Sequence, residues 1–320
     1  IKAPMPKTPL DSALGSASLI AHTIHDKFKL KLPAYRQESE LKRLGLPISR
    51  QTMTNWHIKV CDYYLGKIYD LLHQELLEEK VIHADETPYQ VLESETAKTY
   101  YWTFLSGRYS DKKITTYHHG SRKGIEAVNF LQDFDGFVHC DQYGGYFQLK
   151  DVTLVGCWAH ARRKFYEAQP QEYDDTSISQ KALAYINQIF HLDSQWAELT
   201  SEERYENRKK QLKPLIEKFI NWCHKKQRNV LRNSKLGKAF SYFLSHEDKF
   251  RNVLRNGDLV LTNNMAERSI KELVMGRNNW IFSQSFKGAQ SVAIILSIIK
   301  TGERNDLDPL KYIQYTHGAS

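Results

Sequence analysis

The chain has 320 residues and a formal net charge of +8, with 41% hydrophobic and 12% aromatic residues. This composition excludes a disordered chain and is typical of a globular protein with one large domain or two. The longest apolar stretch, SVAIILSIIK, is too short to cross a bilayer, so we expect no membrane partner. The basic charge permits a polyanionic partner, but it is equally typical of a merely basic protein.

Residues 1–80 are predicted to be helical and to form a DNA-binding region. One helix is expected to end near Gly45, and a second to begin after Ser49, a typical N-cap residue. Apolar residues of the second helix are spaced by three and four, at Met53, Trp56, Val60, Tyr64 and Ile68. Polar residues at its start are Arg50, Gln51 and Asn55. They would face DNA if the two helices form a helix-turn-helix; the alternative is an ordinary helical hairpin packed on its neighbour.

Residues 81–168 are predicted to combine strands with one crossover helix. Three β-rich runs, KVIHADETPYQVL, TYYWTFLSG and KITTYHHG, are separated by turn residues, so they favour a meander. The helical stretch GIEAVNFLQDF leads to two further strands, in GFVHCDQYGGY and VTLVGCWAH. A crossover helix places the next strand parallel to one of the first three. The expected fold class is therefore α/β with a mixed sheet.

Residues 169–255 are predicted to be helical and strongly charged, as an insertion or a separate subdomain, and residues 256–320 return to helices. A basic run near Trp222 contains Lys225, Lys226, Arg228, Arg232, Lys235 and Lys238. Basic residues around an aromatic ring suit DNA, and a solvated helix face is an equal alternative.

Two predicted strand ends carry the same pattern, VIHAD and FVHCD. Residues i and i+2 of a strand share a face, so Asp85 shares a face with His83, and Asp141 with His139. A carboxylate in this place either caps the turn that follows or, with a second carboxylate, forms a site. The repetition favours a shared site. We expect the histidines to bond neighbouring groups and not a metal, because Mg²⁺ prefers oxygen ligands.

A third acid, Glu267, lies near the start of a predicted helix in LTNNMAERSIKELVMGRNNW. With Asn264 as the N-cap, Glu267 would occupy the third helical position, where a capping box is the structural alternative. It precedes Ile270 by three residues and Val274 by seven, so it is expected to face inward. Two aspartates and a glutamate suit two Mg²⁺ ions in phosphoryl transfer, one activating the nucleophile and one stabilising the leaving oxygen.

On these residues the chain resembles the transposases of the insertion sequence 66 family, which belong to the DDE class and have an RNase H-like core. The matching stretches are LPAYRQESELKRLGLPISRQTMTNW, HADETPYQVL, CDQYGGY, GCWAHARRKF and the segment from TNNMAER to LDPLKYI. The resemblance implies that Asp85, Asp141 and Glu267 are catalytic and bind two Mg²⁺ ions, for which Mn²⁺ can substitute. This chain has Thr262 where the family usually has Asp, and it lacks the family's upstream zipper-like helix and Cys-rich zinc motif.

The architecture implied is an RNase H-like core with a mixed sheet, interrupted by an α-helical insertion and preceded by an α-helical N-terminal domain. Its expected parts are DNA-binding helices at 1–80, the first part of the core at 81–168, the insertion at 169–255, and the end of the core with the Glu267 helix at 256–320.

The activity implied is cleavage at transposon ends, followed by transfer of the 3′-OH strand into target DNA. Partners implied are the transposon ends, the target DNA, a second copy of the chain in a DNA-bound homodimer, and accessory proteins of the same element. An RNase H-like nuclease without strand transfer, and a non-catalytic DNA-binding protein with structural acids, stay open as alternatives.

The motif GCWAHARRKF and the glutamate helix supply further DNA contacts. If the motif is helical, one side of it carries His160, Arg163 and Lys164, and the core-facing side carries Trp158, Ala161 and Phe165. Cys157 and His160 have the spacing of a soft-metal pair, but there is no second pair, so zinc is not expected. Arg268 and Arg277 are candidates for holding DNA phosphates near the metal ions.

The cysteines and the start of the chain indicate the compartment. Cys61, Cys140, Cys157 and Cys223 are scattered, which favours reduced thiols over a disulfide framework. The first residues, IKAPMPKTPLDS, contain neither an apolar signal segment nor an initiator Met. We expect a bacterial cytoplasmic protein, associated with the nucleoid, whose natural chain begins further upstream.

Overall fold

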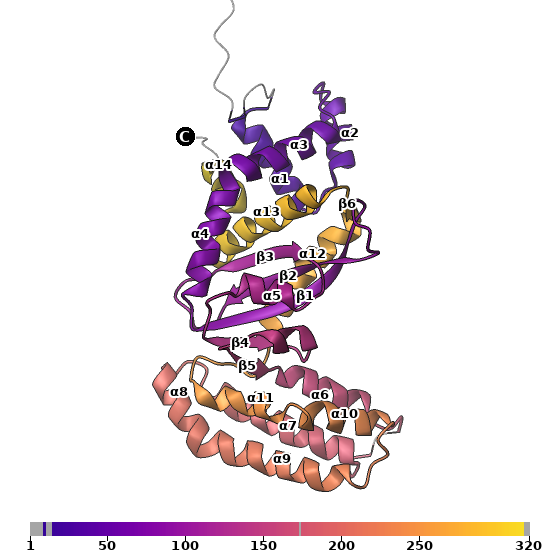
Figure 1. The fold of residues 1–320 in the computed structure, drawn as a ribbon, viewed down its shortest axis with the longest axis vertical. Coiled ribbons are helices and arrows are strands. Elements are labelled where there is room, and N and C mark those ends of the chain that lie inside the picture. The colour runs from indigo at the N-terminus through magenta and orange to yellow at the C-terminus, as the bar shows by residue number, and fades with distance from the viewer. Residues whose placement is uncertain (1–8, 11–14, 173, 317–320) are drawn as a thin grey trace, which may run out of the picture.

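A six-stranded mixed sheet occupies the middle of the computed structural model, which describes residues 9–10, 15–172 and 174–316 (Figure 1). Helices from the N-terminal part lie at one end of the molecule and a bundle of helices lies at the other (Figure 1). The first eight residues, on which part of the expectation about the compartment rests, lie outside the described residues.

The N-terminal helices are α1 (Ala17–Phe28), α2 (Ala34–Arg43), α3 (Arg50–Val60), a π-helical turn at Cys61–Leu65, and α4 (Gly66–Leu77). The predicted turn is confirmed: α2 ends two residues before Gly45, which adopts the left-handed φ of 81°. The side chain of Ser49 accepts a hydrogen bond from the Thr52 N–H at 3.1 Å, so the predicted N-cap of α3 is also confirmed. Met53, Trp56 and Val60 are buried, as their spacing predicted.

The sheet contains β1 (Val81–Val91), β2 (Thr99–Ser106), β3 (Thr115–Gly120), β4 (Phe137–Cys140) and β5 (Thr153–Gly156), in the order β3-β2-β1-β4-β5. Strands β1, β2 and β3 form the predicted antiparallel meander. Helix α5 (Ile125–Phe130) then crosses over, and β4 pairs parallel to β1, which confirms the predicted mixed sheet. Strand β5 is parallel to β4, and the short β6 (Phe282–Ser283) pairs with the far end of β1.

The two faces of the sheet are covered by different helices. Tyr89, Tyr101 and Tyr117 share one core with the buried residues of α13 (Phe286–Arg304) and of the N-terminal helices. On the opposite face, Ile82 and Phe104 pack with α5 and the 3₁₀ turn at Gly144–Gln148. Alternation along β1 therefore decides which side chains point towards each layer.

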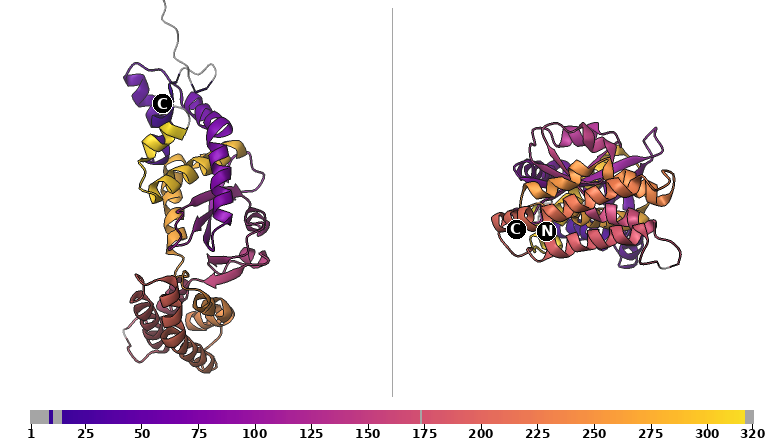
Figure 2. Two further views of the ribbon diagram at one scale, coloured as in Figure 1. Left: turned by 90° about the vertical axis from the view of Figure 1, so that its left-hand side faces the viewer. Right: turned by 90° about the horizontal axis from the view of Figure 1, so that it is seen from below.

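The bundle at the far end comprises α7 (Ile178–Ser194), α8 (Ser201–Asn207), a π-helical turn (Arg208–Leu212), α9 (Lys213–Gln227), α10 (Lys235–Leu244), α11 (Glu247–Arg251) and a 3₁₀ turn (Asn252–Arg255). We call residues 178–255 the helical block; a side view shows it as a separate layer beyond the sheet (Figure 2). Helix α6 (Trp158–Glu167) joins the sheet to this block, and its Trp158, Ala161 and Phe165 are buried in the block's core, as predicted.

Trp222 is half-buried and packs against the core of the helical block. Its ring lies 6.1 Å from Phe219, stacked at 19°, and 5.6 Å from Tyr185. Trp222 and Phe219 are three residues apart on α9, so they lie on the same side of that helix. Stacking of DNA on Trp222 stays a prediction.

The chain returns from the helical block to the place where it left the sheet. The Trp158 N–H donates to the Leu261 carbonyl at 2.8 Å, at the start of α6 and just before α12 (Asn264–Trp280). Helices α13 and α14 (Pro309–Thr316) complete the chain. All four cysteines are buried free thiols. No helix within the described ranges is long and apolar enough to span a membrane.

Candidate active site

Asp85, within β1, and Asp141, the first residue after β4, lie at the same level of the sheet. The prediction that Asp85 ends its strand is wrong, because β1 continues to Val91 in its pairing with β2. In the parallel register of β1 and β4, His83 pairs with His139, and each aspartate follows its histidine by two residues. Strand β4 ends at Cys140, so Asp141 begins the loop, and its Oδ1 accepts a hydrogen bond from the Tyr143 N–H at 2.8 Å. Asp141 therefore has the turn-capping role that was the structural alternative, and it also faces the strand that carries Asp85.

Glu267 comes to the aspartates from the first turns of α12. The N-cap of this helix is Asn263, one residue earlier than predicted, and Glu267 is the fourth helical residue. The capping box that was the structural alternative for Glu267 does not form, because the Asn263 side chain makes no cap bond. Instead, the Glu267 carboxylate approaches α6: Oε1 lies 3.7 Å from His160 Nδ1, and Oε2 lies 3.7 Å from an Arg163 guanidinium nitrogen.

The three acids are close enough to affect one another electrostatically. Burial raises the pKa of Asp85 to about 8, and the charges of Glu86, Asp141 and Glu267 add to this shift. A carboxyl group surrounded by other carboxylates is most favourably ionised when a cation lies among them. The oxygen-only donor set of Asp85, Asp141 and Glu267 fits a hard divalent cation such as Mg²⁺.

A fourth carboxylate, Glu86, supports this site from the opposite face of β1, and our sequence analysis missed it. The Tyr146 hydroxyl donates to Glu86 Oε2 at 3.0 Å, and Arg122 donates to Oε1 at 3.2 Å. Tyr146 lies on the 3₁₀ turn that follows Asp141, so Glu86 ties the loop of Asp141 to β1. Its position next to Asp85 was the only signal in the sequence.

Asn263 joins β1 to the start of the glutamate helix, which was also missed. Its Nδ2 donates to the Ala84 carbonyl at 2.8 Å, so its Oδ1 accepts from His83 Nδ1 at 2.9 Å. The fully buried His83 ring stacks on His139, with centroids 4.4 Å apart and planes 6° from parallel. His139 Nε2 accepts the Val260 N–H at 3.4 Å. As predicted, both histidines bond neighbouring protein groups.

The predicted DNA contacts fall into three groups. Arg50, Gln51 and Asn55 are exposed on α3, and the Gln51 amide donates to Asn55 Oδ1 at 3.2 Å. His160 and Arg163 lie beside Glu267 as described, whereas Lys164 is exposed further along α6. Arg268 is exposed next to Glu267 on α12.

Arg277, the second arginine predicted to hold DNA phosphates, contacts β1 two to three residues beyond Asp85. It follows Glu267 by ten residues on α12, a rise of about 15 Å. Its guanidinium donates to the Pro88 carbonyl and lies 3.4 Å from Thr87 Oγ1, so it fastens α12 to β1.

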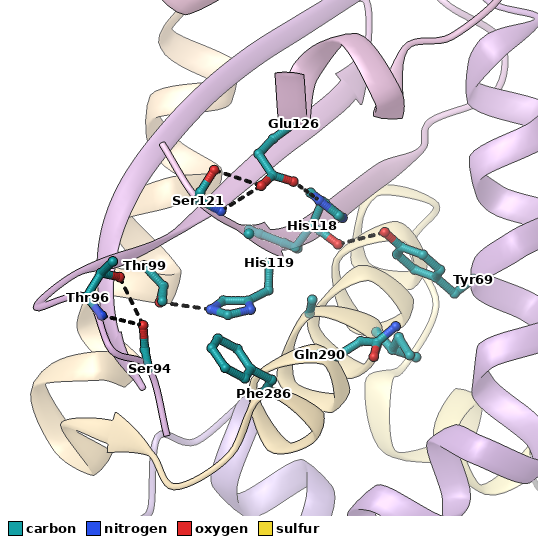
Figure 3. A pocket seen from close by; sticks show the side chains of 14 residues that line it. Tyr69, Ser94, Thr96, Thr99, His118, His119, Ser121, Glu126, Phe286 and Gln290 are labelled. Atoms are coloured by element: carbon teal, nitrogen blue, oxygen red, sulfur yellow. Dashed lines mark hydrogen bonds and ion pairs between the residues drawn. The ribbon is translucent and has the colours of Figure 1, made fainter. Parts of the chain in front are cut away.

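A cavity of about 500 Å³ lies along the edge strand β3 and α13, away from the acids (Figure 3). Its polar side chains bond mainly to protein groups: His118 Nε2 lies 3.1 Å from Glu126 Oε2, and His119 Nε2 lies 2.9 Å from Thr99 Oγ1. None of the three acids lines this cavity. Its wall on β3 is two strands from β1, about 10 Å across the sheet.

Comparisons with known proteins show the family of the chain. A family model described as "Transposase IS66 family" matches residues 13–291. Among curated proteins of Sinorhizobium fredii (strain NBRC 101917 / NGR234), the uncharacterized protein y4hP is 27% identical over 319 residues, which cover 92% of this chain and 58% of y4hP. The uncharacterized protein y4qI is 25% identical over 339 residues, which cover 99% of this chain and 61% of y4qI. The chain thus spans about 60% of the length of these relatives, and no solved structure matches it.

Proposed function

Because this chain belongs to the IS66 family of transposases, we propose that it is a DNA transposase of the DDE class, with Asp85, Asp141 and Glu267 as its catalytic carboxylates. The observation that carries the proposal is the proximity of these acids. Asp85 on β1 and Asp141 just after β4 each follow one of two paired histidines on parallel strands, and Glu267 is near enough to raise the pKa of Asp85. The strand order β3-β2-β1-β4-β5, with an antiparallel meander followed by parallel β4 and β5, supports an RNase H-like core.

The carboxylates would hold divalent cations, two Mg²⁺ ions in the family's chemistry, with Mn²⁺ as a substitute. When bound, these ions would neutralise the acids and the negative charge that develops on the phosphate. The chain's own contribution is positioning: Asn263 holds the glutamate helix on β1, and Glu86 holds the loop of Asp141.

The reaction would proceed in two phosphoryl transfers without a covalent protein–DNA intermediate. Water first attacks the phosphodiester at the transposon end, which releases a 3′-OH. This 3′-OH then attacks a phosphodiester of the target, forms the new bond, and displaces the target's own 3′-oxygen. Arg163 and Arg268 are exposed beside Glu267 and would contact DNA phosphates there.

DNA recognition would begin at the helix-turn-helix of α2 and α3. Arg50, Gln51 and Asn55 form an outward polar row at the start of α3, the part of a recognition helix that meets base edges. We propose that a second copy of the chain, together with accessory proteins of the element, brings two ends together.

A strand-transfer assay tests the proposal. The substrates are a duplex that carries a pre-cut end of the encoding element and a supercoiled target plasmid, incubated with Mg²⁺. The expected product is the end joined covalently to the plasmid, and Glu267→Gln should abolish it while the exposed control Glu198→Gln should not. Cleavage without joining would instead favour a nuclease. Salt-dependent DNA binding that ignores Mg²⁺, with no cleavage, would favour a non-catalytic DNA-binding protein.

A crystal soaked in Mn²⁺ would test the metal site directly. Anomalous density between Asp85 and Asp141, within reach of Glu267, is the expected result. Density elsewhere only would exclude these acids as the metal ligands of the DNA-free protein.

A further inference from the structure

Cys157, His160 and Glu267 bring three kinds of metal ligand together beside the acids. One ligand atom from each of them lies within 4.8 Å of the other two. Cys157 is the N-cap of α6 and His160 lies in its first turn, three residues on, while Glu267 comes from α12. The spacing in the sequence supplied only two ligands, and the fold adds the third.

Two atoms of this cluster are buried without a hydrogen bond. Neither His160 Nδ1 nor Glu267 Oε1 has a hydrogen-bond partner in the described part of the chain. They face each other at 3.7 Å, which is too long for a hydrogen bond. The same distance suits two ligand atoms of a tetrahedral ion with bonds of about 2.0–2.2 Å. A cation between them would satisfy both atoms.

The third ligand and the charges suit a divalent ion. Cys157 is fully buried, and its sulfur accepts the Asn263 N–H at 3.3 Å. Burial raises the pKa of this thiol, and a metal ion bound to the sulfur would displace its proton. A thiolate, a carboxylate and a neutral imidazole together carry two negative charges, which one divalent ion would neutralise. Arg163 approaches only Oε2 of Glu267, so Oε1 is left for the ion.

We propose that Cys157, His160 and Glu267 bind one transition-metal ion of the zinc type, with water as the fourth ligand. Sulfur and nitrogen ligands favour Zn²⁺ and Co²⁺ over Mg²⁺, so this site differs from the oxygen-only site in its choice of metal. Glu267 belongs to both sites. If the proposed catalytic role of Glu267 is correct, an ion held by Cys157 withdraws this carboxylate and inhibits Mg²⁺-dependent strand transfer.

Titration of the metal-free protein with Co²⁺ tests the site, because cobalt bound to a thiolate gives a charge-transfer absorption band in the near ultraviolet. We expect one Co²⁺ per chain with such a band, and its loss when Zn²⁺ is added. Cys157→Ser should abolish the band, and His160→Gln should weaken Co²⁺ binding at least tenfold. Cys223→Ser, which changes a buried thiol in the helical block, should leave both unchanged.

X-ray absorption of the unmodified protein loaded with one equivalent of Zn²⁺ makes the test independent of whether the variants fold. The expected first shell contains one sulfur, with nitrogen and oxygen. A shell without sulfur, or no cobalt–thiolate band in the unmodified protein, would overturn the proposal and leave His160 and Glu267 as a direct ion pair.

The Asp85→Asn variant separates this site from the catalytic one. It should lose Mn²⁺ at the aspartates and keep the cobalt–thiolate band. Loss of the Mn²⁺ site with retention of the band is therefore the signature of two distinct metal sites. If Asp85→Asn removed the band as well, Co²⁺ would depend on the aspartates, and a separate site would be excluded.

Discussion

In the metal-free protein, the ionised Asp85 carboxylate lowers the stability of the folded state. The same carboxylate is available to bind a cation. The pKa of Asp85 is about 8 in the folded chain against an ordinary value of 3.8, so the folded state retains a proton that the unfolded state loses. The stability that this proton contributes is fully present below about pH 4 and is lost as the pH rises through about 8. An ionised Asp85 thus opposes folding until a cation binds.

Replacing Asp85 by Asn should therefore stabilise the metal-free protein and inactivate it. At pH 8, in a chelator, we expect the free energy of unfolding to rise by roughly 1–3 kcal/mol, a value reduced because the side chain is partly exposed. The gain should shrink towards pH 4. Denaturant unfolding at several pH values measures it, and a strand-cleavage assay should detect no product. A variant that is no more stable at pH 8 than at pH 4, relative to the unmodified chain, would contradict this account.

Asn263 is the residue on which the approach of the glutamate helix depends. Asn263→Ala would leave His83 Nδ1 and the Ala84 carbonyl buried without partners. We expect the free energy of unfolding to fall by about 2–4 kcal/mol. Asn264→Ala, at the exposed next position, is the matched control and should change it by less than about 0.5 kcal/mol. Equal effects of the two substitutions would mean that the Asn263 bridge does not hold the helix.

At the scale of elements, Arg208 fastens the helical block to the segment that leads to α12. Its side chain is 1% exposed and donates to both carboxylate oxygens of Asp193, at 2.7 and 3.3 Å. It also donates to the carbonyls of Asn256 and Leu259, at 3.0 and 2.9 Å. The Arg208 guanidinium therefore donates to carbonyl groups of the segment that leads to α12, which receive no backbone hydrogen bond from a strand or helix in the described part of the chain.

Arg208→Met should destabilise the protein by about 3–5 kcal/mol, because it leaves the Asp193 carboxylate and two carbonyls buried without a donor. Lys209→Met changes the exposed next residue and should have little effect. Thermal unfolding followed by circular dichroism compares the two. Similar thermal unfolding midpoints for both variants would show that other contacts hold the segment that leads to α12.

Local sequence patterns predicted the helices and strands well. They predicted poorly which residues that are far apart in the sequence contact each other. The Ser49 cap and the crossover helix depend on neighbouring residues, so the sequence alone predicted α3 and a fourth strand parallel to one of the first three, which the structure shows to be β1. The bridge from Asn263 to His83 joins positions 180 residues apart and leaves no periodic trace. Composition linked Trp222 to the basic run, and its spacing from Phe219 also indicated the ring contact that the half-buried Trp222 makes with that residue.

The same reasoning explains what could be predicted of the site. The aspartates were visible because both follow the same repeated pattern of apolar residues and a histidine, although only Asp141 comes directly after a strand end and Asp85 lies within β1. Glu267 was visible because it lies in the first turns of a predicted helix. The neighbours of Glu267 could not be predicted, because α6 and α12 meet only through the fold: His160 and Glu267 lie 107 residues apart in the sequence and 3.7 Å apart in space.

For the whole molecule, three buried histidines set the stability in acid. His57, His83 and His139 are at most 3% exposed, and burial lowers the pKa of each, to about 4 for His83. The unfolded chain binds these protons near pH 6.5 and the folded chain does not. Stability is therefore complete above pH 6.5 and falls as the pH drops below it.

We expect the free energy of unfolding to decrease between pH 6.5 and 4 by about 1.4 kcal/mol per pH unit for each histidine that stays neutral. Denaturant midpoints at pH 7.5, 6 and 5 measure the slope. His57→Gln, at the Thr23 contact away from the acids, should reduce the slope by one histidine's share. An unchanged slope would show that His57 does not titrate on unfolding.

After the helical block, the chain returns to the place where it left the sheet, and this affects how the site folds during synthesis. Asp141 leaves the ribosome 126 residues before Glu267, which at about 5–20 residues per second is an interval of roughly 6–25 s. During that time the nascent chain has both aspartates and an unfinished sheet, while the helical block can form its own local contacts. Glu267 follows the helical block in the chain, so the third acid can join the other two only after the whole block has been synthesised and Leu261 can contact the Trp158 N–H.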